Sequence, residues 1–417
     1  MQRICHSRKY TLCSPRSVTE FMKSALSANS ATCLAEISVV LGIAQQCLTS
    51  DTASDLFITD QLVTETVLKF LNTFESLSEC AAQTKGFTDK QSIRNVAELI
   101  WRNLKNKKLA KEKRHVQTIH SFVGSKLLDG FGLAYAVVAA CQLLGRDDVC
   151  LALSEGHCWV VFGEGLSMNA EVALQGVNCG EASVPIHVGA ETGFGATRES
   201  WLYLRGNAVI CQDPRLAVAA SFCAISANAD NSQDTELTEF QRELLWICYN
   251  MGILDRYPLG LISLADLHGS HDFRLLDLQC ENLYKQAVEC TRMQYANHHV
   301  YPYTYYGRYL YRTDRYTEAI EMWKNAANVL RRYSYSRDDD EIHKEMKEIV
   351  CDFLPSSLKQ ERVCDNGSVF ANFILLLDAL CQWEEGSRTA VIYNNWLVTC
   401  APVCYVLTCP YAVVCVC

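Results

Sequence analysis

The hydrophobic periodicity of the chain changes twice along its length, and this limits the folds that the chain can adopt. Residues 1–101 and 213–368 repeat apolar side chains at the three- and four-residue spacing of helices. Between them, one apolar helix at 132–144 is followed by short apolar runs separated by glycines, a pattern typical of strands and turns. The sequence therefore predicts a mainly α fold that includes a small α+β domain at 102–212.

Part of the second helical region matches a tetratricopeptide repeat. Small and aromatic residues stand at the positions where such a repeat needs two antiparallel helices to approach closely, namely Gly307, Tyr316, Ala319, Trp323 and Ala326. Helical pairs of this kind stack into concave surfaces that bind peptides. We therefore expect a helical region with tetratricopeptide-like motifs and a peptide ligand.

The charge balance bears on the class of partner. The chain has 38 Lys and Arg against 47 Asp and Glu, a formal net charge of −9. Phosphate backbones are bound by net basic surfaces, so this balance argues against direct, sequence-specific nucleic-acid binding. A basic run at 102–114 is typical of a solvated helix end or linker, with an import signal or a patch for an anionic partner as the alternative.

The cysteines are numerous but do not form a recognisable ligand pattern. There are 22, and no two are three residues apart, so the sequence lacks a CxxC half-site for zinc or for a redox pair. Most lie inside apolar runs, where cysteine behaves as a small hydrophobe. We expect reduced, buried thiols in an intracellular protein, with no metal and no cofactor.

The final segment, 396–417, differs in composition from the rest of the chain. It is almost wholly apolar, contains five cysteines and carries no charge. Its length suits a bilayer span, whereas Pro402, Pro410 and the missing charged flank argue against one. A non-native or alternatively spliced terminus is the favoured interpretation, and a membrane-anchored adaptor is the alternative.

One arrangement of residues is typical of an enzyme scaffold. In papain-like and transglutaminase-like folds a cysteine opens a helix, a histidine on a following strand serves as base, and an acidic residue on the next strand orients the histidine. The corresponding residues are Gly132, His157 and Glu171, and glycine carries no nucleophile. Cys158 directly follows His157, so on a strand it faces the opposite side. The sequence predicts an inactive domain; a cysteine hydrolase with a displaced nucleophile is the alternative.

Three glutamates suggest a cationic ligand. Glu341, Glu345 and Glu348 share one face of a helix that begins with aspartates. Acidic residues at a helix start complement its dipole, but a stripe that continues down the helix repels itself. A cationic group on a partner would relieve that repulsion.

An aromatic stripe lies one helix pair earlier. Tyr301, Tyr305 and Tyr309 recur at i, i+4 and i+8, with Trp323 on the partner helix. Stripes of this kind are more often core than binding surface. If both stripes border one groove, it would bind a peptide that carries arginine and an aromatic residue or proline.

Nine short runs, in order along the chain, resemble the menin family. They are SFVGSK at 121–126, LALSE at 151–155, HCWVVF at 157–162, SWLYL at 200–204, DRYP at 255–258, LADL at 264–267, YPY at 301–303, DEI at 340–342 and QWEEG at 382–386. The resemblance extends over roughly residues 12–395 and stops after Trp396.

The resemblance implies a non-enzymatic nuclear scaffold in several parts. These are an N-terminal helical domain (1–101), an inactive transglutaminase-like α+β domain (102–212), a helical palm with tetratricopeptide-like motifs (213–368), the start of a fingers region (369–395) and a tail outside the family (396–417). The expected partners are a short N-terminal motif of mixed-lineage-leukaemia (MLL)-type histone methyltransferases, JunD-type transcription factors and a chromatin-associated LEDGF-type protein. The basic C-terminal part that holds the family's import signals is absent, so a nuclear location rests on the resemblance alone.

Carried over position by position, the resemblance implies a peptide pocket in the palm. Glu341, Glu345 and Glu348 would pair with the arginines of the peptide. The walls would be formed by Ser154, His157, Cys158, Cys223, Tyr257, Leu259, Tyr301, Thr304, Tyr305, Trp323 and Ile349. Phe131, Ala220 and Ser263 stand where the mammalian protein has other side chains, which alters the expected shape of the pocket.

Overall fold

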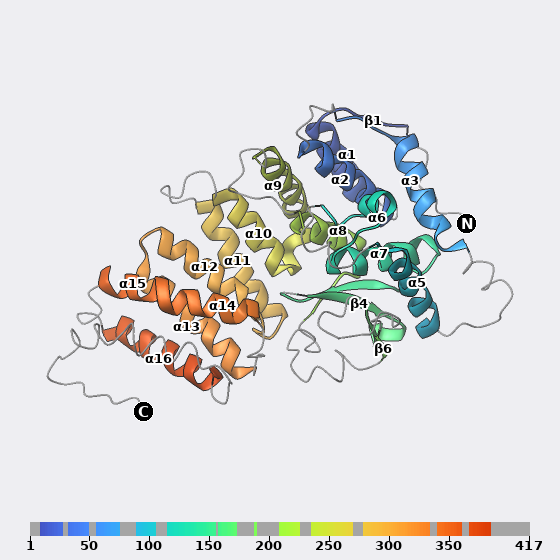
Figure 1. The fold of residues 1–417 in the computed structure, drawn as a ribbon. Coiled ribbons are helices and arrows are strands. Elements are labelled where there is room, and N and C mark those ends of the chain that lie inside the picture. The colour runs from blue at the N-terminus through green and yellow to red at the C-terminus, as the bar shows by residue number, and fades with distance from the viewer. Residues whose placement is uncertain are drawn as a thin grey trace. The chain divides into compact units, whose positions relative to one another are not determined.

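We describe the fold from a computed structural model. It covers residues 9–27, 32–49, 56–75, 89–105, 115–155, 157–172, 187–189, 208–225, 235–269, 278–333, 340–360 and 367–384. The described part of the chain divides into two compact units, the first running to Leu267 and the second beginning at His268 (Figure 1). That boundary falls inside the stretch expected to form one palm, and the finer division of the chain stays a prediction.

Helix α2 (Leu34–Leu48) lies at the centre of the first unit. It is apolar on almost every side, and its residues from Leu34 to Gln45, with the exception of Glu36, are buried. The other helices that pack in this unit are α1 (Pro15–Ser27), α3 (Asp60–Asn72), α5 (Asp89–Asn103), α6 (Ile119–Ser125), α7 (Gly130–Leu143), α8 (Pro214–Cys223), α9 (Thr235–Asn250), the 3₁₀ turn η5 (Ile253–Arg256) and α10 (Pro258–Gly269). A short antiparallel pair, β1 (Thr11–Leu12) and β2 (Ile58–Thr59), completes the helical part.

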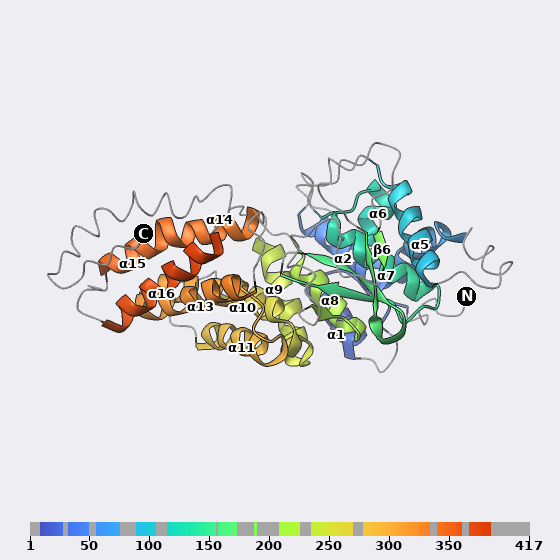
Figure 2. The same cartoon turned by 90° about the horizontal axis from the view of Figure 1, so that it is seen from below.

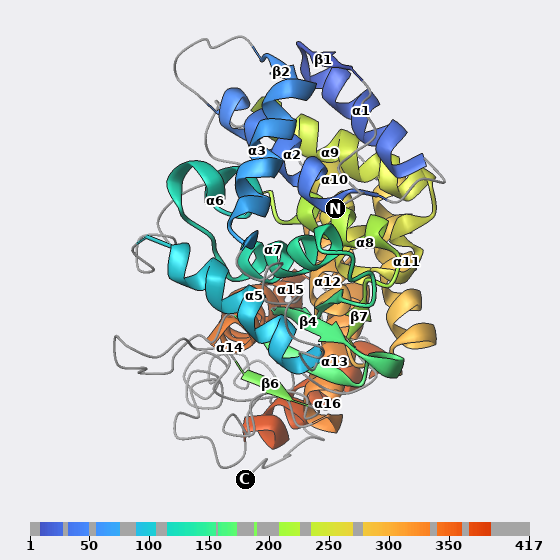
Figure 3. The same cartoon turned by 90° about the vertical axis from the view of Figure 1, so that its right-hand side faces the viewer.

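The sheet of the first unit is antiparallel, as the glycine-punctuated apolar runs predict. Among the described residues its strands follow the order β6-β5-β4-β3-β7. They are β3 (Cys150–Leu153), β4 (Cys158–Phe162), β5 (Met168–Glu171), β6 (His187–Gly189) and β7 (Val209–Ile210), with the 3₁₀ turn η2 (Glu164–Leu166) between β4 and β5. Helices α5 and α7 lie beside this sheet (Figure 3). The mainly α fold with a small α+β part is confirmed.

Helix α7 begins two residues earlier than its periodicity predicts. Asp129 is its N-cap, and its Oδ1 accepts a hydrogen bond of 2.7 Å from the backbone N–H of Gly132. The helix is rich in alanine and valine, and its residues from Gly132 to Cys141 are buried. A helix without a polar face belongs inside a protein, which is where α7 lies.

The second unit is helical. Helices α12 (Tyr301–Arg312) and α13 (Tyr316–Arg332) pack against each other, and α16 (Gly367–Glu384) packs along α13 (Figure 2). The remaining elements are α11 (Leu278–Gln294), α14 (Asp340–Glu348), the π-helical turn η6 (Ile349–Phe353) and α15 (Leu354–Gln360). The α12–α13 pair is the predicted tetratricopeptide-like hairpin.

A close approach at Gly307 brings α12 onto α13. A Cβ at this glycine would lie 2.4 Å from Nε1 of Trp323, which is fully buried in α13. The Trp323 ring packs on Tyr311 and Phe353, with ring centroids 6.1 and 6.0 Å away. A small residue at position 307 therefore permits the helix pairing, as the repeat pattern predicts.

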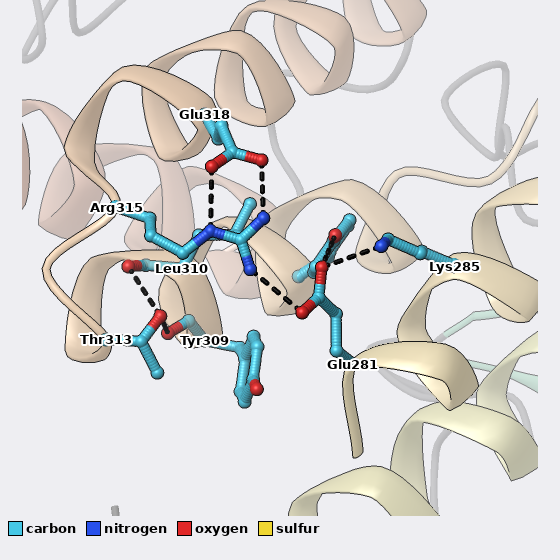
Figure 4. A network of polar contacts seen from close by, with 8 residues as sticks. Glu281, Lys285, Tyr309, Leu310, Thr313, Arg315 and Glu318 are labelled. Carbon is cyan, nitrogen blue, oxygen red and sulfur yellow. Dashed lines mark hydrogen bonds and ion pairs between the residues drawn. The ribbon is translucent and has the colours of Figure 1, made fainter. Parts of the chain in front are cut away.

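A polar network ties α11 to this hairpin (Figure 4). The buried carboxylate of Glu281 receives Lys285 Nζ at 2.7 Å, the Tyr306 hydroxyl at 3.1 Å and an Arg315 guanidinium nitrogen at 2.9 Å. Arg315 also forms a two-point pair with Glu318, its Nε and a terminal nitrogen donating at 2.7 and 2.5 Å. One buried carboxylate thus joins three helices.

The described cysteines, thirteen in number, are all free, and most are buried or half-buried. Within the same ranges, no group of three His, Cys, Asp or Glu side chains could hold a metal ion. No single helix of the described part has the length and apolar character needed to cross a membrane, although α6 and α7, bent by 100° to each other, meet those criteria as a pair. The segment 396–417 lies outside the described residues.

Candidate functional site

A histidine–carboxylate pair stands where an enzyme of this scaffold would keep its base. His157 lies just before β4, and Glu171 closes β5. The His157 Nε2 atom is 2.7 Å from Glu171 Oε2, and the Glu171 side chain is 4 % exposed. The strand register brings them together, since β4 and β5 are adjacent and antiparallel. The pairing of His157 with Glu171 that the sequence predicts is therefore present in the structure.

The position of the missing nucleophile is filled by backbone. Gly132 lies in the first turn of α7, and a Cβ added there would be 2.9 Å from the Cα of Gln117 and from a methyl group of Leu128. A cysteine at this position would need the segment before α6 to move. Atoms of Gln117 and Leu128 therefore occupy the space that a nucleophilic thiol at position 132 would need.

Cys158 does not replace that nucleophile. Its Sγ lies 3.7 Å from the carbonyl oxygen of Gly130, at the start of α7. Burial raises the pKa of the Cys158 thiol well above its usual range, and the neighbouring carboxylates of Glu171 and Asp129 raise it further. The thiol is therefore protonated at neutral pH and is a poor nucleophile.

The other first-unit residues expected in the peptide pocket fall into two groups. Ser154 and His157 form the β3–β4 turn, where the Ser154 N–H donates to the His157 carbonyl at 2.8 Å. Cys223, at the end of α8, has the hydroxyls of Tyr257 and Ser263 within hydrogen-bonding reach. Burial raises the pKa of Cys223 to about 12, so it is a neutral donor and acceptor in this cluster.

Leu259 is linked to the Cys223 cluster through the backbone of α10. Its carbonyl oxygen accepts a hydrogen bond of 2.9 Å from the Ser263 hydroxyl. The Leu259 side chain is half-buried, whereas Tyr257 is almost fully buried. Each of these positions stays a prediction as a peptide contact.

In the second unit, the acidic stripe carries an arginine of the chain itself. A terminal nitrogen of Arg308, on α12, lies 2.5 Å from Glu345 Oε2 and 2.7 Å from Glu348 Oε2, both on α14. The shared face of Glu345 and Glu348 matches the spacing argument. Glu341 belongs to α14, but its side chain lies outside the described residues. The sequence analysis did not identify Arg308. This residue lies three positions after Tyr305 and therefore on the same side of α12.

The environment of Glu345 disfavours its charged form. Burial raises the pKa of this carboxyl, and the neighbouring Glu348 raises it further. Arg308 and the Thr304 hydroxyl act in the opposite direction, but the net pKa is raised. The side chain of Glu345 is 12 % exposed against 41 % for Glu348, so the two carboxylates differ in their access to water.

The aromatic stripe of α12 divides into two parts. The rings of Tyr301 and Tyr305 meet edge to face, with centroids 5.8 Å apart. The ring of Tyr309 instead packs on Tyr284 of α11, at 5.2 Å. Tyr309 therefore continues the stripe along α12, but its ring packs toward α11.

Three further positions expected in the pocket wall are buried. Thr304, Trp323 and Ile349 are each 0 % exposed. Ile349 begins the π-helical turn η6, and Thr304 donates a hydrogen bond to the Tyr301 carbonyl at 3.3 Å. By contrast, Tyr301, Tyr305, Arg308, Glu345 and Glu348 are half-buried and therefore partly accessible.

Comparisons with known proteins agree on one family. A family model described as Menin matches residues 16–401. Among solved structures, the chain is similar to a crystal structure of menin that reveals the binding site for Mixed Lineage Leukemia (MLL) protein. The sequences are 34 % identical, the TM-score is 0.80, and the match covers 95 % of this chain and 89 % of the menin chain.

Proposed function

The chain belongs to the menin family, and on that premise we propose that it is a non-enzymatic nuclear scaffold. It binds a short N-terminal motif of MLL-type histone methyltransferases that contains arginine, an aromatic residue and proline. Binding brings the methyltransferase to chromatin and so regulates transcription. JunD-type transcription factors and a LEDGF-type chromatin protein are further proposed partners.

The observation that carries this proposal is the guanidinium held by α14. Glu345 and Glu348 bind the Arg308 guanidinium, which also lies 6.0 Å from the Tyr305 ring and 5.6 Å from the Phe353 ring. Paired carboxylates beside aromatic faces are the environment in which arginine binds most strongly. A peptide arginine next to an aromatic residue or proline would find the same chemistry here.

Catalysis is not part of the proposal, because the scaffold holds a base without a nucleophile. His157 and Glu171 are paired, but Gly132 has no side chain and the space around it is filled. The alternative, a hydrolase that uses a displaced cysteine, would need a thiolate close to His157, and Cys158 is held protonated.

A titration tests the proposal. A fluorescein-labelled N-terminal peptide of an MLL-type methyltransferase is titrated with the protein, and its anisotropy is followed. We expect saturable binding that is weakened about thirtyfold or more by Glu345→Lys combined with Tyr305→Ala, since truncating a buried charged partner typically has an effect of this size. Thermal melts establish that the variants are folded.

Glu321→Lys is the matched control for that titration. Glu321 is exposed on α13, and its replacement makes the same change in charge as Glu345→Lys. The Glu321→Lys variant should bind the peptide with the same affinity as the wild type. Absence of saturable binding, or equal weakening by both charge changes, would overturn the proposal.

A further inference from the structure

The contact between Arg308 and α14 has the geometry of an imperfect arginine site. Both ion pairs use one terminal nitrogen of the guanidinium, at 2.5 and 2.7 Å. The Nε atom of Arg308 is buried and has no hydrogen-bond partner among the described residues. Arginine binds a carboxylate best through two parallel N–H···O bonds, and Arg308 makes no such pair here.

The position of Arg308 on the chain explains this geometry. Its backbone belongs to α12, which is held against α13 where Gly307 packs on Trp323, and its side chain extends from α12 to α14. A guanidinium that approaches on a mobile peptide has no such restriction and can align both of its terminal nitrogens with one carboxylate. An external arginine therefore can bind these glutamates more favourably than the internal one.

The internal arginine also cancels part of the field that would attract a cationic peptide. Without Arg308, the two adjacent carboxylates would repel each other and would attract a positive charge strongly. With Arg308 in place, half of that negative charge is already compensated. The Arg308 side chain is 21 % exposed, so water and a ligand can reach it.

We propose that Arg308 is a specificity-determining residue of the peptide site, a resident guanidinium that a peptide arginine must displace from Glu345 and Glu348. The inference rests on the proposed function and adds to it that an arginine of the chain itself occupies the two glutamates before the peptide binds. The wild-type protein then gains less from a peptide arginine at this point than the same site would without Arg308. Its preference shifts toward the aromatic and proline side chains of the motif.

Two peptides and three proteins test this inference. The labelled methyltransferase peptide and its counterpart with arginines changed to glutamine are titrated into the wild type, Arg308→Gln and Arg308→Lys. We expect Arg308→Gln to bind the arginine peptide about tenfold more tightly than the wild type does. Changing the peptide arginines to glutamine should weaken binding to the Arg308→Gln protein much more than it weakens binding to the wild type.

Arg308→Lys separates charge from shape. Lysine keeps the charge but lacks the planar fork and stacks less well on Tyr305 and Phe353, so it should be displaced more easily. We expect tighter binding than the wild type by a smaller factor than in Arg308→Gln. This variant also provides the test if Arg308→Gln fails to fold, which a thermal melt detects.

The outcomes separate the inference from the proposed function. If no protein shows saturable binding, the proposed function falls, and the inference falls with it. If the wild type binds but a folded Arg308→Gln binds equally or more weakly, Arg308 is a structural clamp between α12 and α14. The inference alone is then overturned. If the change of the peptide arginines to glutamine weakened binding equally in all three proteins, the inference would be overturned as well.

Discussion

Gly42 of α2 lies directly against Thr118, the residue that caps α6. A Cβ at position 42 would be 2.4 Å from Thr118 Oγ1 and 2.6 Å from the Cβ of His120. Thr118 is 2 % exposed, and its hydroxyl oxygen accepts the N–H of Ser121 at 3.3 Å. The centre of the first unit therefore depends on the absence of a side chain at one position of α2.

Replacing this glycine should destabilise the protein. Gly42→Ala forces a methyl group against Thr118 and displaces the cap, and we expect a loss of about 1–3 kcal/mol, the usual range for overpacking. Urea denaturation followed by circular dichroism measures it. Gly124→Ala in α6 is the control, because nothing lies within 4 Å of its Cβ position, and it should be neutral or slightly stabilising. Equal effects of the two substitutions would contradict the account.

Glu281 should contribute stability that disappears at acidic pH. Burial by itself would raise the pKa of this carboxyl, but Lys285 and Arg315 outweigh burial, and the net pKa is lowered. A lowered folded-state pKa stabilises the protein above the unfolded pKa of about 4.3, and this contribution is lost as pH falls through the folded value. Glu281→Gln should therefore lower the Tm at pH 7 and flatten its fall below pH 4.5. A Tm difference that is constant from pH 7 to pH 3 would exclude this role.

Glu345 should behave in the opposite way. Its pKa is raised, chiefly by burial, so the ionised carboxylate opposes folding. Considered alone, Glu345 therefore makes the protein more stable at pH values below the pKa of the unfolded state than at pH values above the pKa of the folded state. We expect Glu345→Gln to raise the Tm at pH 7, with the difference disappearing below about pH 4. A lower Tm at pH 7 would show that the pair with Arg308 outweighs desolvation.

The buried cysteines of the first unit should be unreactive in the folded protein. Burial holds the Cys158 thiol protonated, whereas Cys13 is exposed. Brief treatment with iodoacetamide at pH 7, followed by peptide mass spectrometry, should modify Cys13 and leave Cys158 intact. Rapid modification of Cys158 would revive the hydrolase alternative. Labelling in urea provides the control, because both cysteines should then react.

Local patterns were sufficient to predict much of the fold. The apolar run at 132–144 predicted a buried helix, and the glycine-punctuated runs predicted the antiparallel strands beside it. His157 and Glu171 could be paired in advance because adjacent strands fix their separation. Gly307 and Trp323 likewise identified the α12–α13 hairpin, since the repeat requires a small residue opposite a large one.

Contacts between distant helices could not be predicted in this way. Arg308 meets Glu345 across 37 residues of sequence, and the spacing within α14 says nothing about which cation lies opposite it. Tyr309 continues the helical spacing of Tyr305, but α11 packs on this side of α12, and the Tyr309 ring contacts Tyr284 of α11. The π-helical turn at Ile349–Phe353 also departs from the 3.6-residue period on which the prediction relied.

The central claim is that the surface formed by α12 and α14 binds the peptide, and hydrogen–deuterium exchange tests this location most directly. Exchange is measured for the wild type with and without saturating methyltransferase peptide. We predict slower exchange in α12 and α14, where Tyr305, Glu345 and Glu348 lie, and unchanged exchange in α3 of the first unit. Saturable binding with no change in α12 and α14 would contradict the account.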